Sequence, residues 1–329
     1  MSGRAVRIAG LGHAVGRRII TNDDLAKIVD TSDEWIRTMT GIRERRFIGE
    51  GESTSTMAAQ AGHEALCASG VRPEEIDLVL VATSTPDYML FPCTACLVQD
   101  ALGLANAGAQ DLSAACSGFV YGLVTASQFI AAGSYERILV IGADSLSPFV
   151  DFTDRATCVL FGDGAGAAVL VADEGSDGLL SFVLGADGSG GPHLNVPAGG
   201  SRRPLTPELA ATHENTIHMN GREVYRFSTT VPVAALEAAA TKAGVAIADL
   251  DLIIAHQANI RILQTAAHNL GVPDERFFTN LDRYGNTSAA TIPLALYDAQ
   301  AQGRLHRHDL VGFMGFGAGL TWATAIWRW

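Results

Sequence analysis

The sequence predicts an α/β protein built from two similar halves, and three observations lead to that prediction. The chain has 329 residues, and at about 150 residues per domain this length favours two domains. Hydrophobic residues make up 48% of the chain and charged residues 18%, which supplies a large core and excludes intrinsic disorder. A helix, glycine and strand pattern also recurs at an offset of 174 residues, which indicates duplication.

The recurring unit consists of an Ala-rich helical stretch, a glycine and a buried strand. In the first copy the helical stretch covers residues 57–69, and Gly70 precedes a β-branched run at 76–80. In the second copy the stretch covers 233–243, and Gly244 precedes the run at 250–254. Each glycine is suited to end a helix, and each run is typical of a strand covered on both faces.

Further strands are predicted at residues 138–143 and 310–315, near the same offset. The predicted halves are therefore residues 1–174 and 175–329, with helices covering the sheets. Residues 175–221 are rich in Gly, Pro, Ser and His, so we expect this stretch to form surface loops that join the halves.

Charge and cysteine content restrict the class of protein. Lys and Arg number 23 and Asp and Glu number 35, giving a net charge of −12, which argues against a nucleic-acid-binding protein. The chain has only five cysteines, and this small, odd number does not favour a disulfide framework, which fits a reducing compartment. With no signal-peptide pattern at the start, we expect a soluble cytoplasmic protein with no membrane insertion. The uncharged stretch 112–135 is long enough to span a bilayer, but its polar residues favour a buried helix.

Cys116 follows a strand-like segment at 109–112 and precedes that uncharged helix. The N–H groups and dipole at a helix start favour a thiolate and lower a thiol pKa, and they can also hold an oxyanion. The sequence therefore allows a nucleophile here. The alternative is a small buried apolar residue, which describes most cysteines.

Two further polar residues lie at informative positions. His256 directly follows the strand of the second repeat, and the carboxyl end of a strand is where open α/β folds bind ligands. Asn286 stands in Gly285-Asn286-Thr287 ahead of an apolar helix. Taken alone, His256 could be a structural histidine, and Asn286 could serve a turn or a helix cap.

Other patterns do not indicate a cofactor or a metal. Cys93-x-x-Cys96 has no second ligand pair, so a metal site is not expected. The glycine-rich segment from Phe161 to Gly166 lacks the spacing of a dinucleotide-binding loop.

Taken together, the motifs resemble β-ketoacyl-acyl-carrier-protein synthase III, a family of thiolase-like condensing enzymes, over essentially the whole chain. The segments that carry the resemblance are Asp30-Thr-Ser-Asp-Glu-Trp35-Ile36, Thr40-Gly-Ile-Arg-Glu-Arg45, Ala115-Cys116-Ser-Gly-Phe119, Arg155 ahead of Phe161-Gly-Asp-Gly-Ala-Gly166, His256-Gln-Ala-Asn259, Gly285-Asn286-Thr-Ser288 and Gly317-Ala-Gly-Leu-Thr-Trp322. The resemblance implies a thiolase-like five-layer α/β/α/β/α sandwich of two related halves. It also implies a homodimer that uses no cofactor or metal beyond its substrates.

The resemblance implies decarboxylative condensation of an acyl-CoA primer with malonyl-acyl-carrier protein, which initiates fatty-acid synthesis. Cys116 would take the acyl group, and His256 and Asn286 would hydrogen-bond the malonyl thioester carbonyl while negative charge develops there. The backbone N–H groups of Cys116 and Ala318 would form the oxyanion hole for attack on the acyl-enzyme.

The remaining roles implied by the resemblance concern binding. Trp35 and Arg155 would stack against the CoA adenine, Asn259 would hydrogen-bond beside the active-site tunnel, and Phe91 would limit the acyl pocket across the dimer interface. Arg226 and Arg261 would belong to the basic patch that meets the acyl carrier protein.

Several positions depart from the family pattern. Met39 replaces a frequent arginine, His268 and Asn269 replace frequent lysines, and Ala318 replaces a glycine whose positive φ an alanine would disfavour. These changes leave the Cys, His and Asn set intact but weaken the docking patch. Three alternatives therefore stay open: an acyltransferase or starter enzyme of a secondary, polyketide-type pathway, a cysteine hydrolase of thioesters, and a non-catalytic partner subunit. The last is disfavoured because Cys116 is present.

Overall fold

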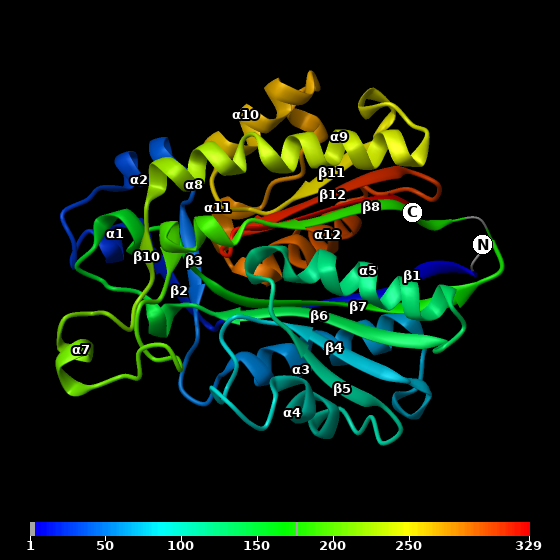
Figure 1. The fold of residues 1–329 in the computed structure, drawn as a ribbon, viewed down its shortest axis with the longest axis horizontal. Helices are drawn as coiled ribbons and strands as arrows, with labels where there is room; N and C mark the ends of the chain where they lie inside the picture. The colour runs from blue at the N-terminus through cyan, green and yellow to red at the C-terminus, as the bar shows by residue number, and fades with distance from the viewer. Residues whose placement is uncertain (1–3, 176) are drawn as a thin grey trace.

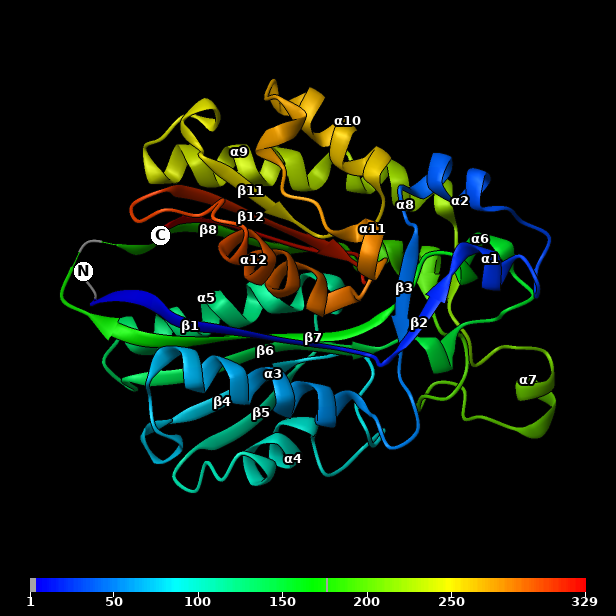
Figure 2. The same ribbon diagram turned by 180° about the vertical axis from the view of Figure 1, so that it is seen from behind.

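The computed structural model describes residues 4–175 and 177–329 and has five layers (Figures 1 and 2). Two β-sheets alternate with three layers of helices. Helices α3 (Thr54–Ser69) and α4 (Thr94–Ala101) cover the outer face of the first sheet. Helices α9 (Val231–Ala243) and α10 (Ile260–Leu270) lie outside the second sheet. The five-layer α/β/α/β/α arrangement expected from the resemblance is confirmed.

The first sheet has the strand order β1-β7-β6-β4-β5. Its strands are β1 (Ala5–Val15), β4 (Leu78–Ala82), β5 (Gly108–Leu112), β6 (Arg137–Ser145) and β7 (Asp163–Asp173). Strands β4, β5 and β6 are parallel to one another, whereas β7 is antiparallel to both of its neighbours.

The second sheet has the order β11-β12-β13-β8. Its strands are β8 (Gly178–Ala186), β11 (Leu252–Ala255), β12 (Leu310–Gly317) and β13 (Thr321–Arg328). Strand β11 is parallel to β12, and the other pairs are antiparallel. The predicted division of the chain at residue 174 falls between β7 and β8.

The repeated unit has the predicted structure in both copies. Helix α3 ends at Gly70, and α9 ends at Gly244, and both glycines adopt the left-handed conformation with φ of 70° and 72°. Strands β4 and β11 follow and begin at Leu78 and Leu252, 174 residues apart. Each strand starts two residues later than predicted, because residues 76–77 and 250–251 still belong to the short turns that precede the strands.

The middle layer consists of α5 (Gly118–Ala131) and α12 (Thr291–Ala301), which lie between the two sheets (Figure 2). Helix α5 forms most of the uncharged stretch and is largely buried, as expected. Within the described ranges, none of the helices is both long enough and apolar enough to cross a membrane.

The two middle helices begin in the same way. A 3-10 turn precedes α5 and another precedes α12. The first residue of each turn has a positive φ although it is not glycine: 47° at Ala115 and 51° at Ser288. Since L-residues rarely adopt this conformation, the shared strain shows that the duplication extends to these turns.

Shorter elements complete the fold and lie together at one end of the two sheets (Figure 1). They are β2 (Arg18–Thr21), β3 (Glu44–Phe47), β9 (Leu194–Asn195), β10 (His218–Met219), α1 (Asn22–Leu25), α2 (Asp33–Thr40), α6 (Arg155–Cys158), α7 (Pro207–Ala211), α8 (Gly221–Ser228) and α11 (Leu281–Tyr284). The expectation that residues 175–221 are only loops is wrong, because β8 lies within them. The glycine-rich composition of residues 175–221 favours loops, and the short apolar run of β8 within it does not stand out in the sequence.

Candidate active site

Cys116 lies where the first sheet meets the middle layer. Strand β5 ends at Leu112 and delivers the chain into the 3-10 turn Ala115–Ser117, from which α5 continues. The side chain of Cys116 is buried. The positive φ of Ala115 sets the direction of this turn, and the cysteine therefore stands at the start of a helix, as the sequence predicts.

Strand β12 of the second sheet passes directly against this turn. A Cβ at Gly317 would lie 2.7 Å from the Cys116 nitrogen and 2.9 Å from its Cβ. Only glycine permits that approach. The end of β12 thereby brings the second half of the chain into contact with Cys116 of the first.

The protonation of Cys116 differs from the expectation. Burial raises the pKa of the Cys116 thiol to about 12, and hydrogen bonds from Ser288 and from the backbone N–H groups of Cys116 and Ala318 only partly oppose that rise. The prediction of a lowered pKa is wrong for the free enzyme, because loss of solvation outweighs the effect of the helix start. Cys116 is therefore a neutral thiol in this structure.

The two N–H groups predicted for the oxyanion hole face the same sulfur. Both N–H groups oppose the rise in the pKa of the Cys116 thiol, and both therefore lie near its sulfur. Among the described residues near this point, positive φ values occur at Ala115, Ser288 and Gly319. Ala318 thus carries its methyl group without the expected strain.

His256 follows β11 directly and is 2% exposed. Burial lowers the pKa of His256 to about 3, so its imidazole is neutral. The ring stands edge-on to Phe316, with centroids 5.0 Å apart, and its Nδ1 lies 2.7 Å from the hydroxyl oxygen of Thr291. These contacts fix the ring and leave Nε2 as the nitrogen available to a substrate.

Asn286 precedes the 3-10 turn that begins α12. Its Oδ1 accepts a hydrogen bond from the Ser288 N–H at 2.9 Å. Because the amide oxygen is engaged in this bond, the amide NH2 group remains available as a donor. The amide is 7% exposed and lines the same cavity as Cys116 and His256.

Two cavities meet at Cys116. The first, about 320 Å³, brings Cys116, His256 and Asn286 together and runs to Trp35 and Tyr225 near the surface. We call it the tunnel. The second, about 540 Å³, continues from Cys116 on the other side, and we call it the acyl cavity. Apolar side chains dominate its lining, among them Met89, Leu146, Phe149, Phe161, Leu194, Val196, Leu205 and Ile217.

Trp35 and Arg155 are in contact with each other. The Arg155 guanidinium lies 4.8 Å from the centroid of the Trp35 ring, and it also donates to the Asp30 carbonyl at 3.1 Å. A ring bound between the two side chains would have to displace Arg155. Asn259 lines the tunnel but also caps α10, and its amide donates to the Met39 carbonyl at 3.0 Å.

The predicted docking arginines lie on helices α8 and α10, which border the tunnel. Arg226 pairs with Glu223 one turn before it, and the Arg261 guanidinium contacts the Met39 sulfur at 3.6 Å. Both arginines are exposed. Arg37, two residues before Met39, pairs with Asp33 on α2 and borders a separate hollow.

Phe91 does not line the acyl cavity of its own chain. Its side chain is 80% exposed, as part of an apolar segment in which Tyr88, Met89 and Leu90 are also exposed. Met89 is the member of this segment that lines the cavity. A contribution from Phe91 across a dimer interface stays a prediction.

Sequence reasoning missed two residues beside the nucleophile. Ser288 lies beside both Cys116 and Asp144, and its hydroxyl opposes the rise that burial causes in the pKa of each side chain. Asp144 is fully buried and accepts the Ser84 N–H at 2.7 Å and the Ala289 N–H at 3.1 Å. Ser288 ends the segment Gly285-Asn286-Thr287-Ser288, but the sequence assigns it no role of its own. Asp144 belongs to no motif, but the apolar strand before it predicts a carboxylate that must be held by hydrogen bonds.

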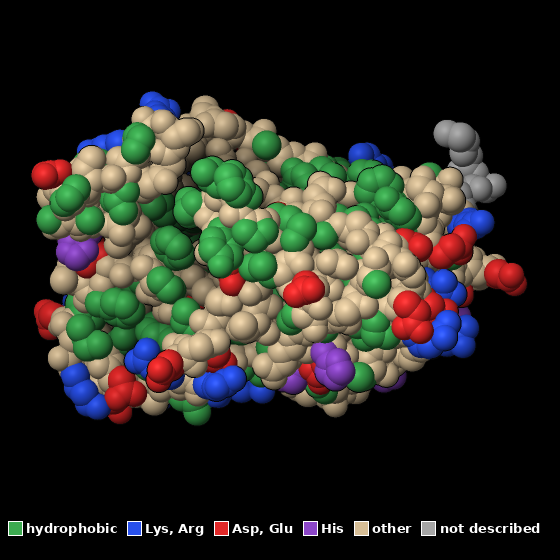
Figure 3. Space-filling view, turned by 90° about the horizontal axis from the view of Figure 1, so that it is seen from below, with side chains coloured by type: hydrophobic (Ala, Val, Ile, Leu, Met, Phe, Trp, Pro, Cys, Tyr) green, Lys and Arg blue, Asp and Glu red, His purple; other side chains and the backbone are tan. Residues whose placement is uncertain are grey.

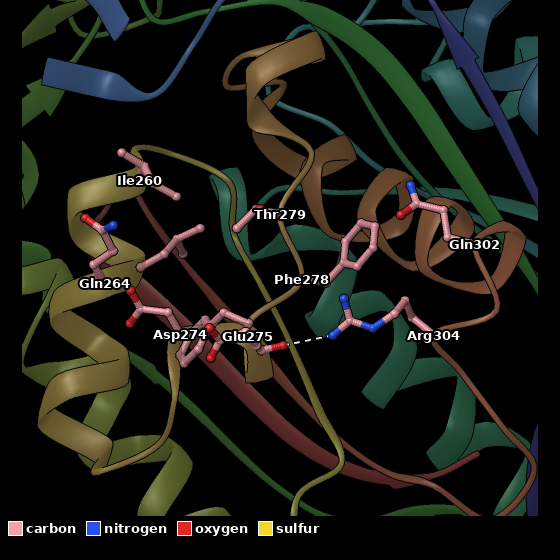
Figure 4. Close-up of a pocket in the computed structure, with 10 residues that line it drawn as sticks. Ile260, Gln264, Asp274, Glu275, Phe278, Thr279, Gln302 and Arg304 are labelled. Atoms are coloured by element: carbon pink, nitrogen blue, oxygen red, sulfur yellow. Dashed lines mark hydrogen bonds between the residues drawn. The ribbon is translucent and has the colours of Figure 1, made fainter. Parts of the chain in front are cut away.

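Another hollow, of about 320 Å³, lies beside α10 (Figure 4). Ile260, Gln264, Asp274 and Gln302 are among its lining residues, and Arg304 donates to the Glu275 carbonyl at 2.8 Å. Its lining residues fall between 260 and 304 and include none of the predicted site residues. It is separate from the tunnel and from the acyl cavity.

Comparison with known proteins identifies the family. Residues 110–188 match the family described as 3-oxoacyl-[acyl-carrier-protein] synthase III, and residues 240–329 match its C-terminal part. β-Ketoacyl-[acyl-carrier-protein] synthase III of Symbiobacterium thermophilum is 53% identical over 326 residues, which cover 99% of this chain and 98% of that protein.

Solved structures agree with this assignment. 3-Oxoacyl-[acyl-carrier-protein] synthase III of Aquifex aeolicus is 43% identical, with a TM-score of 0.91, over 99% of this chain and 100% of that one. The priming β-ketosynthase of the R1128 polyketide pathway is 33% identical, with the same TM-score of 0.91, over 99% and 97%. The fold is thiolase-like, and the chain belongs to the β-ketoacyl-[acyl-carrier-protein] synthase III family of acyltransferases.

Proposed function

We propose that this enzyme condenses an acyl-CoA primer with malonyl-acyl-carrier protein and so initiates fatty-acid synthesis. The observation that carries the proposal is that Cys116, His256 and Asn286 line one tunnel. A buried thiol beside two hydrogen-bonding side chains provides both a nucleophile and a site for developing negative charge. No step requires a cofactor.

In the first half-reaction, the Cys116 sulfur attacks the thioester carbonyl of acyl-CoA. The tetrahedral oxyanion lies near the N–H groups of Cys116 and Ala318, which both face the sulfur. CoA leaves, and the acyl chain extends into the acyl cavity. Apolar side chains line that cavity, so the acyl chain is buried away from water.

In the second half-reaction, the malonyl group occupies the tunnel. Decarboxylation places negative charge on its thioester oxygen, and Asn286 and His256 stabilise that charge by donating hydrogen bonds. The resulting carbanion attacks the acyl-Cys116 carbonyl and forms the β-ketoacyl product. Arg226 and Arg261, exposed on helices that border the tunnel, are placed to meet an acidic carrier protein.

The exposed segment from Tyr88 to Phe91 supports a homodimer. These four side chains are 54%, 66%, 83% and 80% exposed, and hydrophobic side chains gather on the face seen from the α3 and α4 side (Figure 3). A contiguous exposed apolar segment of this kind marks an interaction site. A second copy would bury it and bring the partner's Phe91 close to the acyl cavity.

Intact-protein mass spectrometry tests the proposed function. The enzyme is mixed with a panel of acyl-CoAs, and malonyl-acyl-carrier protein is then added. We expect a mass gain on Cys116 that malonyl-acyl-carrier protein discharges into a β-ketoacyl product. Cys116→Ala is the control and should show no mass gain.

Other outcomes would favour other functions. An acyl group that water removes, with no effect of malonyl-acyl-carrier protein, would indicate a thioester hydrolase. An acyl group that moves only to a different acceptor would indicate an acyltransferase of a secondary pathway. Similarity to the R1128 priming enzyme shows that the fold serves such pathways too, so the acceptor is the deciding observation.

A further inference from the structure

The hydroxyl of Thr291 contacts Nδ1 of His256, whereas the other ring nitrogen, Nε2, is available to a substrate. Thr291 begins α12, and both side chains are 2% exposed. Its Oγ1 lies 2.7 Å from His256 Nδ1 and 2.9 Å from the Ser288 carbonyl oxygen. One hydroxyl group therefore serves two neighbours at once.

The Thr291 hydroxyl has only one proton, so it can donate a hydrogen bond to only one of its two neighbours. A carbonyl oxygen can only accept, so the proton of Thr291 points to Ser288. Oγ1 then accepts a hydrogen bond, and Nδ1 must carry the proton that it receives. With the opposite tautomer, Nδ1 and the Ser288 carbonyl would compete for one proton, and a buried acceptor would lose its partner.

A neutral imidazole protonated at Nδ1 has a lone pair at Nε2. Cys116 lines the same tunnel as His256. Burial raises the pKa of the Cys116 thiol to about 12 and lowers that of His256 to about 3. The two groups therefore do not form a thiolate–imidazolium pair at rest, and the thiol must give up its proton as it attacks.

We propose that Thr291 is a positioning residue that holds His256 in the Nδ1-protonated tautomer, so that Nε2 accepts the proton of Cys116 during acylation. The proposal rests on the proposed function for its substrate, whereas the tautomer itself is a property of the free enzyme.

The proton balance follows the two half-reactions. In the first, the Cys116 S–H bond breaks, Nε2 gains the proton, the new sulfur–carbonyl bond forms, and the departing CoA sulfur takes the proton from Nε2. In the second, one solvent proton reaches Nε2 as the malonyl carboxylate enters. It is donated towards the enolate oxygen and returns to the Cys116 thiolate when the product leaves. The Nδ1–H bond to Thr291 persists throughout, and one proton is consumed for each carbon dioxide released.

Nitrogen-15 NMR of histidine-labelled enzyme tests the tautomer directly, with His256→Ala used to assign the His256 signals. We expect a protonated Nδ1 and an unprotonated Nε2 in the wild type. Thr291→Ser keeps the hydroxyl and should keep this pattern, whereas Thr291→Val should lose it. Thr324→Val is a matched control, since it removes a buried hydroxyl that donates only to the Ala235 carbonyl at 3.0 Å.

Rapid-quench measurement of acyl-Cys116 formation tests the consequence. We expect Thr291→Val to slow acylation by about 10- to 100-fold, with Thr291→Ser and Thr324→Val within about threefold of the wild type. A wild-type Nε2–H signal would overturn the proposal, as would folded Thr291→Val acylating at the wild-type rate. If Thr291→Val fails to fold, the wild-type spectrum alone decides the tautomer.

The proposed function and this inference can fail separately. If no acyl-CoA labels Cys116 of the wild type, the proposed function is wrong. Alkylation of Cys116 by iodoacetamide then replaces acylation as the rate that Thr291→Val should slow. Equal alkylation rates in the two proteins would reject the role of Thr291.

Discussion

At the scale of single residues, the orientation of Asn286 separates the two half-reactions. Its oxygen is held by the Ser288 N–H, so only its NH2 group is available to a substrate oxygen. We expect Asn286→Ala to reduce decarboxylation by about 10²- to 10³-fold, because the enolate loses a donor. Acylation of Cys116 should change little, since that step uses the N–H groups of Cys116 and Ala318.

The measurement follows the release of carbon dioxide from malonyl-acyl-carrier protein and, separately, the mass gain from acyl-CoA. Asn286→Asp is a useful companion, because it keeps the acceptor for Ser288 and removes the donor. An equal loss of both half-reactions in Asn286→Ala would contradict this division.

The sequence predicts which residues form the candidate site better than it predicts their protonation. Cys116, His256 and Asn286 are marked by residue type and position, because each borders a recognisable helix or strand. The pKa of Cys116 could not be predicted, since it depends on burial created by β12 of the other half. Thr291 and Asp144 carry no motif, and their importance depends on distances that only the folded chain shows.

At the scale of elements, the contact between β12 and the turn around Cys116 leaves no room for a side chain at Gly317. Gly317→Ala would place a methyl group 2.7 Å from the Cys116 nitrogen, so the strand or the turn must shift. We expect a loss of about 1–3 kcal/mol in the free energy of unfolding and at least a tenfold slower acylation, about 1.4 kcal/mol in the barrier.

Gly188→Ala is the matched control for this prediction. A Cβ at Gly188 meets nothing within 4 Å, and its φ is not positive. Urea denaturation and acylation rates of both variants provide the comparison. Wild-type behaviour in Gly317→Ala would mean that β12 does not constrain the nucleophile.

Elements with local signals were predicted correctly, and the others were not. Gly70 and Gly244 end their helices in the sequence as they do in the structure, because a left-handed residue is a local requirement. Strand β8 was missed because its place at the edge of the second sheet is set by pairing with β13, more than a hundred residues away. The positive φ values at Ala115 and Ser288 likewise could not be predicted from the residue types.

At the scale of the whole molecule, assembly should depend on the segment from Tyr88 to Phe91. We expect the double variant Leu90→Asp, Phe91→Asp to shift the protein from the proposed dimer towards monomer, because it places two charges in the proposed apolar contact. Light scattering coupled to size-exclusion chromatography measures the mass, with 34.6 kDa expected for one chain.

A second exposed apolar residue provides the control for assembly. Ile28 is 62% exposed and lies outside this segment, so Ile28→Asp should leave the mass unchanged. A monomeric wild type, or a dimer that persists in the double variant, would exclude this interface.

Stability should also depend on pH through His256. Burial lowers its pKa from 6.5 to about 3, so the unfolded chain binds a proton below about pH 6.5 that the folded chain excludes. This contribution to stability is complete above pH 6.5 and is lost as the pH falls towards 3. The loss between about pH 7.5 and about pH 5 should reach about 2 kcal/mol.

Comparison with His256→Gln isolates this effect, because the other histidines are common to both proteins. Urea midpoints are measured for each protein at both pH values, and the wild type should lose about 2 kcal/mol more than the variant. The same loss in both would show that His256 does not exclude a proton on folding.

The meeting of the two cavities at Cys116 has a kinetic consequence. In the proposed mechanism the acyl chain remains in the acyl cavity, whereas CoA and the malonyl-carrying arm of the carrier protein both use the tunnel. One thioester must leave before the next can enter, and free CoA therefore competes with the incoming malonyl-acyl-carrier protein for the acyl-enzyme. Product inhibition follows from this shared passage, so that chain initiation slows when unacylated CoA accumulates.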